Sequence, residues 1–169
     1  MDNIIKKAAT ATLKGNNLSC PGTNINQVGD ILSDAMLLIP WKVEHGFVSL
    51  GVLWQAEAVY KRFSDRLHNL PEINLSGHSL GAGVALLVGY KLLVNGYPGI
   101  ININCCGGVK GVSKKLGIWL SCRAHINWRI RRRDPVPYLG WWSMPALIIV
   151  EGDPKKHIFD YDIKEHVMY

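Results

Sequence analysis

The chain has 169 residues, of which 48% are hydrophobic, and it carries a formal net charge of +6. This length is enough for one domain with a buried core. No apolar run approaches the roughly 20 residues that a membrane-spanning helix needs, and the N-terminus lacks the long apolar segment of a signal peptide. We therefore expect a cytoplasmic location, and secretion by another route is left open.

The first half of the chain predicts one short strand and one long amphipathic helix. Residues 16–20 are typical of a strand, which Pro21-Gly22 ends. A compact apolar patch follows at residues 35–41. Over residues 47–68, apolar side chains recur at helical spacing and charged side chains cover the opposite side, which predicts a helix that Pro71 ends.

The second half predicts strands that alternate with helices. The expected elements are strands at 72–76, 100–106, 123–129 and 146–150, helices at 82–88 and 112–120, and the start of a helix near 162. This alternation favours an α/β fold with a mostly parallel central sheet flanked by helices. The pattern contains no linker that would split the chain, so we expect a single domain over residues 1–169.

A serine stands between the strand at 72–76 and the helix that follows it. The segment is Gly77-His78-Ser79-Leu80-Gly81, the G-x-S-x-G pattern of a nucleophile elbow. A serine in this context lies on a sharp turn at a helix N-terminus, where backbone N–H groups favour developing negative charge. Glycines are needed on both sides because a side chain there would clash with neighbouring backbone. Ser79 is therefore the candidate nucleophile of an α/β-hydrolase-like domain, and a plain glycine turn is the alternative.

A serine nucleophile needs a base and an acid that orients the base. In the α/β arrangement these residues follow the serine in the order acid, then histidine. The acidic residues between Ser79 and His157 are Asp134, Glu151 and Asp153. Asp134 is favoured because it directly follows a strand and precedes Pro-Val-Pro, at the strand end where active groups gather. His157 and His166 are the downstream candidates for the base, and composition does not choose between them.

The remaining chemistry-bearing residues are four cysteines and a basic cluster. Cys20, Cys105, Cys106 and Cys122 show no metal-ligand spacing, so we expect reduced thiols, no metal and no organic cofactor. The cluster contains Arg129, Arg131, Arg132 and Arg133, with Trp128, Trp141 and Trp142 nearby. It suits an anionic membrane surface or nucleic acid, and a solvated strand end is the alternative.

Six segments, in order, resemble the class 3 lipases of the fungal triacylglycerol lipase type. They are Pro21-Gly22-Thr23, Val43-Glu44-His45-Gly46-Phe47, Gly77 to Gly83, Cys106 to Gly111, Arg133-Asp134-Pro135-Val136-Pro137, and Asp162 to Tyr169. They are similar to that family's R-G-[ST], V-H-x-G-F, G-H-S-L-G, F-G-x-P-x-x-G, D-x-V-P and D-I-x-x-H-x-x-Y blocks. The elbow and acid blocks are the specific ones, and Pro21 stands where the family has arginine.

The resemblance implies a function and the roles of particular residues. Ser79 would be the nucleophile, Asp134 the acid and His166 the base, with His157 as the alternative base. Thr23 and the backbone N–H of Leu80 would form the oxyanion hole. A family lid would fall in residues 24–41, for which a core-packing role is the alternative.

The resulting hypothesis is a serine hydrolase that cleaves carboxylic esters of lipids without a cofactor. Its partners would be a lipid or other ester and an anionic membrane surface, with no nucleic acid expected. One alternative is an esterase or phospholipase that acts on other esters. The other is a non-catalytic membrane- or nucleic-acid-binding protein on a hydrolase fold.

Overall fold

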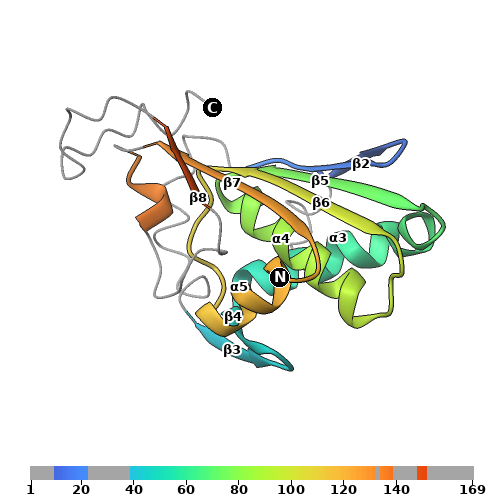
Figure 1. Cartoon of the computed structure of the whole chain (residues 1–169), viewed down its shortest axis with the longest axis horizontal. Helices are drawn as coiled ribbons and strands as arrows, with labels where there is room; N and C mark the ends of the chain where they lie inside the picture. The colour runs from blue at the N-terminus through green and yellow to red at the C-terminus, as the bar shows by residue number, and fades with distance from the viewer. Residues whose placement is uncertain (1–9, 23–38, 132–133, 139–147, 152–169) are drawn as a thin grey trace.

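A six-stranded sheet forms the centre of the molecule (Figure 1). The computed structural model describes residues 10–22, 39–131, 134–138 and 148–151. In spatial order the strands are β1 (Thr12–Lys14), β2 (Asn17–Cys20), β5 (Glu72–His78), β6 (Ile100–Cys106), β7 (His125–Arg131) and β8 (Ile148–Glu151). Only β1 pairs antiparallel with its neighbour, and every other neighbouring pair is parallel. The predicted α/β fold with a mostly parallel sheet is therefore confirmed.

Three helices pack on one face of this sheet (Figure 1). They are α3 (Leu50–His68), α4 (Leu80–Val94) and α5 (Lys114–Ser121). The strands β2, β5, β6 and β7 follow one another in a single direction across the sheet. Right-handed crossovers between successive parallel strands then place every connecting helix on the same side. No helix in the described ranges combines the length and the hydropathy that crossing a membrane requires.

The core lies between the sheet and α4. Twelve of the fifteen residues of α4 are buried, which agrees with the expectation from its uniformly apolar sequence. On the sheet side, the alternating residues of the central strands are buried, and among them are Ile73, Leu75, Ile101 and Ile103. Gly89 brings α4 close to the sheet, because a β-carbon there would lie 2.8 Å from Cδ1 of Ile103.

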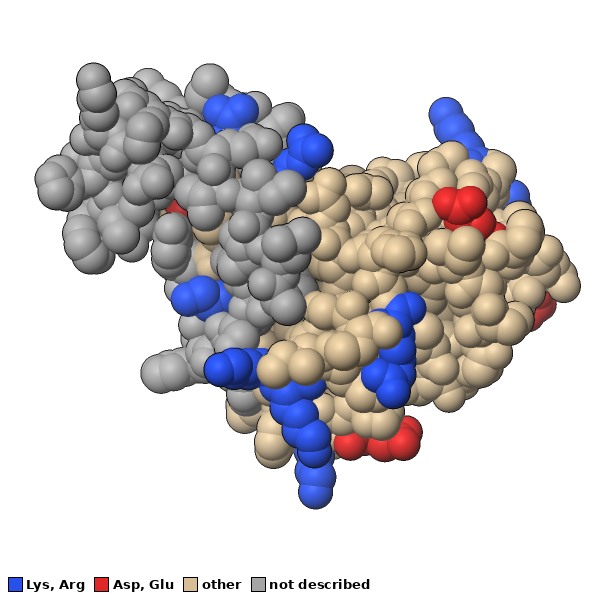
Figure 2. Space-filling model, viewed as in Figure 1, with Lys and Arg blue, Asp and Glu red and all other residues tan. Residues whose placement is uncertain are grey.

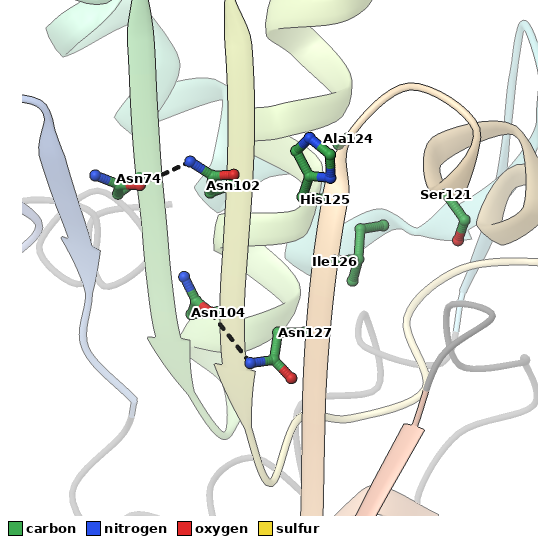
Figure 3. A pocket seen from close by; sticks show the side chains of 8 residues that line it. All are labelled: Asn74, Asn102, Asn104, Ser121, Ala124, His125, Ile126 and Asn127. Atoms are coloured by element: carbon green, nitrogen blue, oxygen red, sulfur yellow. Dashed lines mark hydrogen bonds between the residues drawn. The ribbon is translucent and has the colours of Figure 1, made fainter.

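The opposite face of the sheet is polar and carries a shallow hollow of about 680 Å³. Its lining residues are Asn74, Asn102, Asn104, Ser121, Ala124, His125, Ile126 and Asn127 (Figure 3). Carboxamides on adjacent strands bond to one another, with 3.0 Å from Asn102 Nδ2 to Asn74 Oδ1 and 3.4 Å from Asn127 Nδ2 to Asn104 Oδ1. Apart from Asn104, the strand residues of this lining lie in the first halves of their strands, so the hollow is centred away from the strand ends where Ser79 and Asp134 lie.

A hairpin replaces the start of the predicted helix. Strands β3 (Pro40–Val43) and β4 (Gly46–Ser49) form this separate hairpin, and α3 begins only at Leu50. Phe47 cannot belong to the helix because its carbonyl accepts a 2.9 Å bond from the N–H of Ser113, and Ser49 donates to the carbonyl of Gly111 at 2.9 Å. These partners lie more than 60 residues away, so helical spacing in the sequence could not reveal them.

Candidate active site

Ser79 occupies a strained turn between β5 and α4. Its backbone has φ 55° and ψ −127°, and it is the one non-glycine residue with positive φ in the described part of the chain. Two backbone hydrogen bonds hold the turn. The N–H of Ser79 donates to the carbonyl of Cys106 at 3.0 Å, and the carbonyl of Ser79 accepts from the N–H of Ala82 at 3.1 Å. A non-glycine residue in such a conformation costs about 1–3 kcal/mol and persists only where its surroundings enforce it. The predicted nucleophile elbow is thus present in geometry as well as in sequence.

The two glycines of the elbow are required by close backbone contacts. A β-carbon at Gly77 would overlap the carbonyl group of Gly81, and one at Gly81 would overlap the carbonyl oxygens of Cys20 and Pro21. The sequence predicted such clashes without naming the partners. The structure adds that the second partner is the end of β2, so the elbow is wedged between its own helix and the neighbouring strand.

We expect Gly81→Ala to lower the free energy of unfolding by about 2 to 3 kcal/mol, because backbone on two segments must move to admit the methyl group. Gly111→Ala is a matched control, since its β-carbon would meet atoms only at 3.9 Å, an ordinary contact. That control should change stability by less than about 1 kcal/mol. Urea unfolding midpoints of both variants test the expectation, and equal midpoints would contradict the wedged elbow.

The loop after β2 passes directly against Ser79. A β-carbon built on Gly22 would lie 2.7 Å from the carbonyl oxygen of His78 and 3.1 Å from Cβ of Ser79. Gly22 immediately precedes Thr23, the predicted oxyanion residue, which itself lies outside the described residues. Leu80 begins α4, so its backbone N–H belongs to the first turn, whose N–H groups have no acceptor within the helix. The contact of Gly22 with the elbow was not foreseen, because only the pairing of β2 with β5 creates it.

Asp134 is fully buried just beyond β7. Its N–H donates to the carbonyl of Arg131 at 3.1 Å, and its Oδ1 accepts from the N–H of Val136 at 2.9 Å. This second bond is the local turn in which an aspartate holds the backbone two residues on. The Asp-Pro-Val-Pro segment therefore shapes the loop and also buries a carboxylate.

Ser79 and Asp134 lie at the same edge of the sheet. His78, Cys106 and Arg129 share one row of the parallel register, and both candidate residues lie beyond that row at the carboxyl ends of their strands. One strand, β6, separates β5 from β7, so these two strands are about 10 Å apart across the sheet. Carboxyl ends of parallel strands are where ligands bind in such sheets.

Three of the described histidines lie away from Ser79 and Asp134. His45 stacks on Trp119 with ring centroids 4.0 Å apart, His68 Nε2 lies 3.0 Å from the hydroxyl of Tyr60, and His125 begins β7 at the far end of that strand. The two candidate bases, His157 and His166, both lie outside the described residues. So do Arg132, Arg133, Trp141, Trp142 and residues 24–38 of the lid predicted at 24–41. The choice of base therefore stays a prediction.

Two of the four cysteines are excluded as competing nucleophiles by their burial. All four are free thiols, and Cys20 and Cys105 are buried. Burial raises the pKa of Cys20 to about 12 and raises the pKa of Cys105 well above its usual value. Both are therefore protonated at neutral pH, when a thiol is a poor nucleophile. Across the described residues, His, Cys, Asp and Glu form no group of three that could hold a metal ion.

Comparisons with known proteins identify the family and the fold. The lipase (class 3) family model matches residues 12–142. The triacylglyceride lipase of Rhizomucor miehei superimposes with a TM-score of 0.63 at 14% identity, over 76% of this chain and 54% of that one. The nonglycosylated Lip2 lipase of Yarrowia lipolytica gives a TM-score of 0.64 at 17% identity, over 82% of this chain and 58% of that one.

The chain thus spans a little over half the length of these fungal lipases. At such low identity they establish the shared α/β-hydrolase fold. No curated protein sequence matches the chain. The family model covers well over half of the residues and includes both Ser79 and Asp134. The chain therefore belongs to the class 3 lipase family.

Proposed function

We propose that this protein hydrolyses carboxylic esters of lipids through a triad of Ser79, His166 and Asp134. The observation that carries the proposal is the strained backbone of Ser79, held between a parallel strand and a helix N-terminus. Strain of this kind serves to aim a serine hydroxyl out of the sheet. The buried Asp134 at the same sheet edge supports a triad, and family membership supports ester chemistry.

The reaction would follow the usual course of acyl transfer. His166 accepts the Ser79 hydroxyl proton while Ser79 Oγ attacks the ester carbonyl carbon. The tetrahedral oxyanion accepts hydrogen bonds from the N–H of Leu80 and from Thr23, each worth roughly 3 kcal/mol in the transition state. Collapse expels the alcohol, which takes the proton from His166, and a water molecule then cleaves the acyl-enzyme.

The direct test is labelling of Ser79 by a fluorophosphonate probe, followed by a chain-length series of p-nitrophenyl esters. Labelling with turnover that rises toward long acyl chains supports a lipase. A preference for short chains would support the esterase alternative. Absence of both labelling and turnover would favour the other alternative, a non-catalytic binding protein on the hydrolase fold.

The proposed partner is an anionic lipid surface, which the basic cluster at the end of β7 would contact. Arg129 is exposed and Arg131 is half-buried at the end of this strand, and Arg132 follows directly. We expect Arg131→Gln with Arg132→Gln to weaken vesicle binding at low salt, since each basic residue near such a surface contributes about 1 kcal/mol. Turnover of a soluble p-nitrophenyl ester should stay within about threefold. Unchanged vesicle binding would support the alternative, in which the cluster is only a solvated strand end.

A further inference from the structure

Exposed apolar side chains gather at one place on the molecule. Among the described residues, five large hydrophobic side chains are exposed by more than two fifths. Four of them, Ile39, Trp41, Phe47 and Ile118, belong to the β3–β4 hairpin, the residue before it, or α5. The fifth, Ile100, begins β6 at the opposite end of the sheet. Single exposed apolar residues need no explanation, but a cluster marks an interaction surface.

The hairpin and α5 are joined, so their exposed residues belong to one surface. Ser113, the N-cap of α5, receives the N–H of Phe47 on its hydroxyl at 3.1 Å and donates its own N–H to the carbonyl of Phe47 at 2.9 Å. At the hairpin turn, His45 stacks on Trp119 of α5. Two separate contacts therefore fix the orientation of the helix against the hairpin. We call the hairpin together with α5 the docking face.

The docking face is also basic. Residues 39–49 and 110–123 contain four lysines and one arginine, against the single acidic residue Glu44. Lys42 lies directly across the hairpin from Phe47, and Lys114 and Lys115 form the first turn of α5. Positive charge at a helix N-terminus opposes the helix dipole, so helix stability does not explain these two lysines. Figure 2 shows basic side chains projecting from the lower edge of the molecule, where the hairpin lies in Figure 1, with acidic atoms close by.

This face lies at the same end of the sheet as Ser79. Helix α3 leads directly into β5 through a three-residue turn, so the helix runs opposite to the strand and begins near the carboxyl end of the sheet. The hairpin immediately precedes α3. From the other side, the chain that leaves β6 reaches the hairpin within five residues, where Gly111 accepts the N–H of Ser49. A surface that holds the hairpin would therefore meet the catalytic end of the molecule.

We propose that the docking face binds the protein to an anionic lipid surface, with Trp41 and Phe47 entering the interface and Lys42, Lys114 and Lys115 meeting the headgroups. The inference rests on the proposed function and names where the enzyme meets its aggregated substrate. Aromatic rings suit the boundary between headgroups and acyl chains, and lysines suit an anionic headgroup layer. Phe47 and Lys42 pair across the hairpin and therefore share one of its faces, whereas Trp41 pairs with Val48 and lies on the other face.

The test measures vesicle binding separately from catalysis. The full chain carrying Ser79→Ala is sedimented with vesicles of phosphatidylcholine and phosphatidylserine, so binding is read without turnover. We expect Trp41→Ala with Phe47→Ala to lower the partition coefficient at least about tenfold, through lost apolar burial in the interface. Ile100→Ala is the matched control, because Ile100 is equally exposed at the other end of the sheet and its loss should leave partitioning unchanged.

Substitutions of charged residues test the proposal independently of the aromatic residues. Lys114→Gln and Lys115→Gln should each weaken binding by about fivefold at low salt, whereas Lys14→Gln and Lys61→Gln, both exposed elsewhere, should not. Glu44→Gln should strengthen binding, because it removes the one acidic side chain from the face. In a chain that also carries Cys106→Ser and Cys122→Ser, so that the accessible native thiols are removed, Lys42→Cys labelled with an environment-sensitive fluorophore should show a blue shift on vesicle addition. This readout requires no aromatic residue to be removed.

The proposal fails if the aromatic pair and the Ile100 control partition alike, or if the label at position 42 shows no shift on bound vesicles. It also fails if the Ser79→Ala chain does not bind vesicles at all. Failure of the hydrolase function would appear elsewhere, as absent turnover of soluble esters by the chain that keeps Ser79, with vesicle binding intact.

Discussion

Replacing Ser79 by alanine is expected to lower kcat for a soluble p-nitrophenyl ester by about 10⁶-fold, to the level of residual binding and oxyanion effects. The reason is that Ser79 Oγ is the group that forms the acyl-enzyme, and the buried thiols of Cys20 and Cys105 cannot replace it. Turnover rates and fluorophosphonate labelling measure the loss. Ser76→Ala is the matched control, since Ser76 lies on the same strand and has no proposed catalytic role.

A second substitution at the same position separates catalysis from folding. Ser79→Gly should abolish labelling as completely as Ser79→Ala, but it should raise the free energy of unfolding by about 1 kcal/mol, because glycine adopts φ 55° without strain. Loss of labelling together with a gain in stability would show that Ser79 is held in this conformation for its chemistry. Turnover by Ser79→Ala near the wild-type rate would overturn the proposed hydrolase.

The histidine that serves as base gives the second large effect. We expect His166→Ala to cost about as much as Ser79→Ala, roughly 10⁶-fold in kcat, since losing either member of a triad disables the same step. His157→Ala should be mild, because His157 follows Pro-Lys-Lys in a charged segment. The ranking rests on the resemblance of Asp162 to Tyr169 to the C-terminal block of the family.

Soluble-ester kinetics with both variants, together with circular dichroism, test this ranking. Added imidazole should partly restore turnover to His166→Ala but not to Ser79→Ala, because only the first variant keeps its nucleophile. The reverse ranking would make His157 the base and the C-terminal resemblance accidental. Wild-type rates in both variants would exclude both histidines from the triad.

Sequence reasoning located the nucleophile because the elbow is a local device. The strand, the two glycines, the serine and the buried helix lie within about twenty residues. The clash at Gly77 is with Gly81 of the same turn, whereas the clash at Gly81 is with Cys20 and Pro21 at the end of β2. The strand ending before Asp134 was equally visible, since Pro-Val-Pro marks the loop. The bond from the N–H of Val136 to Asp134 is equally local, whereas the burial of Asp134 depends on the whole fold.

Long-range pairing decided what the sequence did not show. Phe47 to Ser49 fit a helical period, yet they form β4 because Gly111 and Ser113 satisfy their backbone groups. In this hairpin Phe47 is exposed. The helical spacing of apolar residues predicted that Phe47 would be buried, because spacing alone does not show which neighbours cover a side chain. Gly22 contacts the elbow only because β2 pairs with β5.

The amino-acid sequence by itself determined the alternation of strands and helices, the elbow at Ser79 and the candidate acid, because each depends on the spacing of neighbouring residues. The tertiary structure alone decided that Ser79 and Asp134 share one sheet edge, that all three described helices cover one face, and that the hairpin and α5 form one surface. The physical reason is that strand order, the handedness of the crossover connections and side-chain exposure all depend on contacts between segments tens of residues apart. No local sequence pattern encodes the free energies of those contacts.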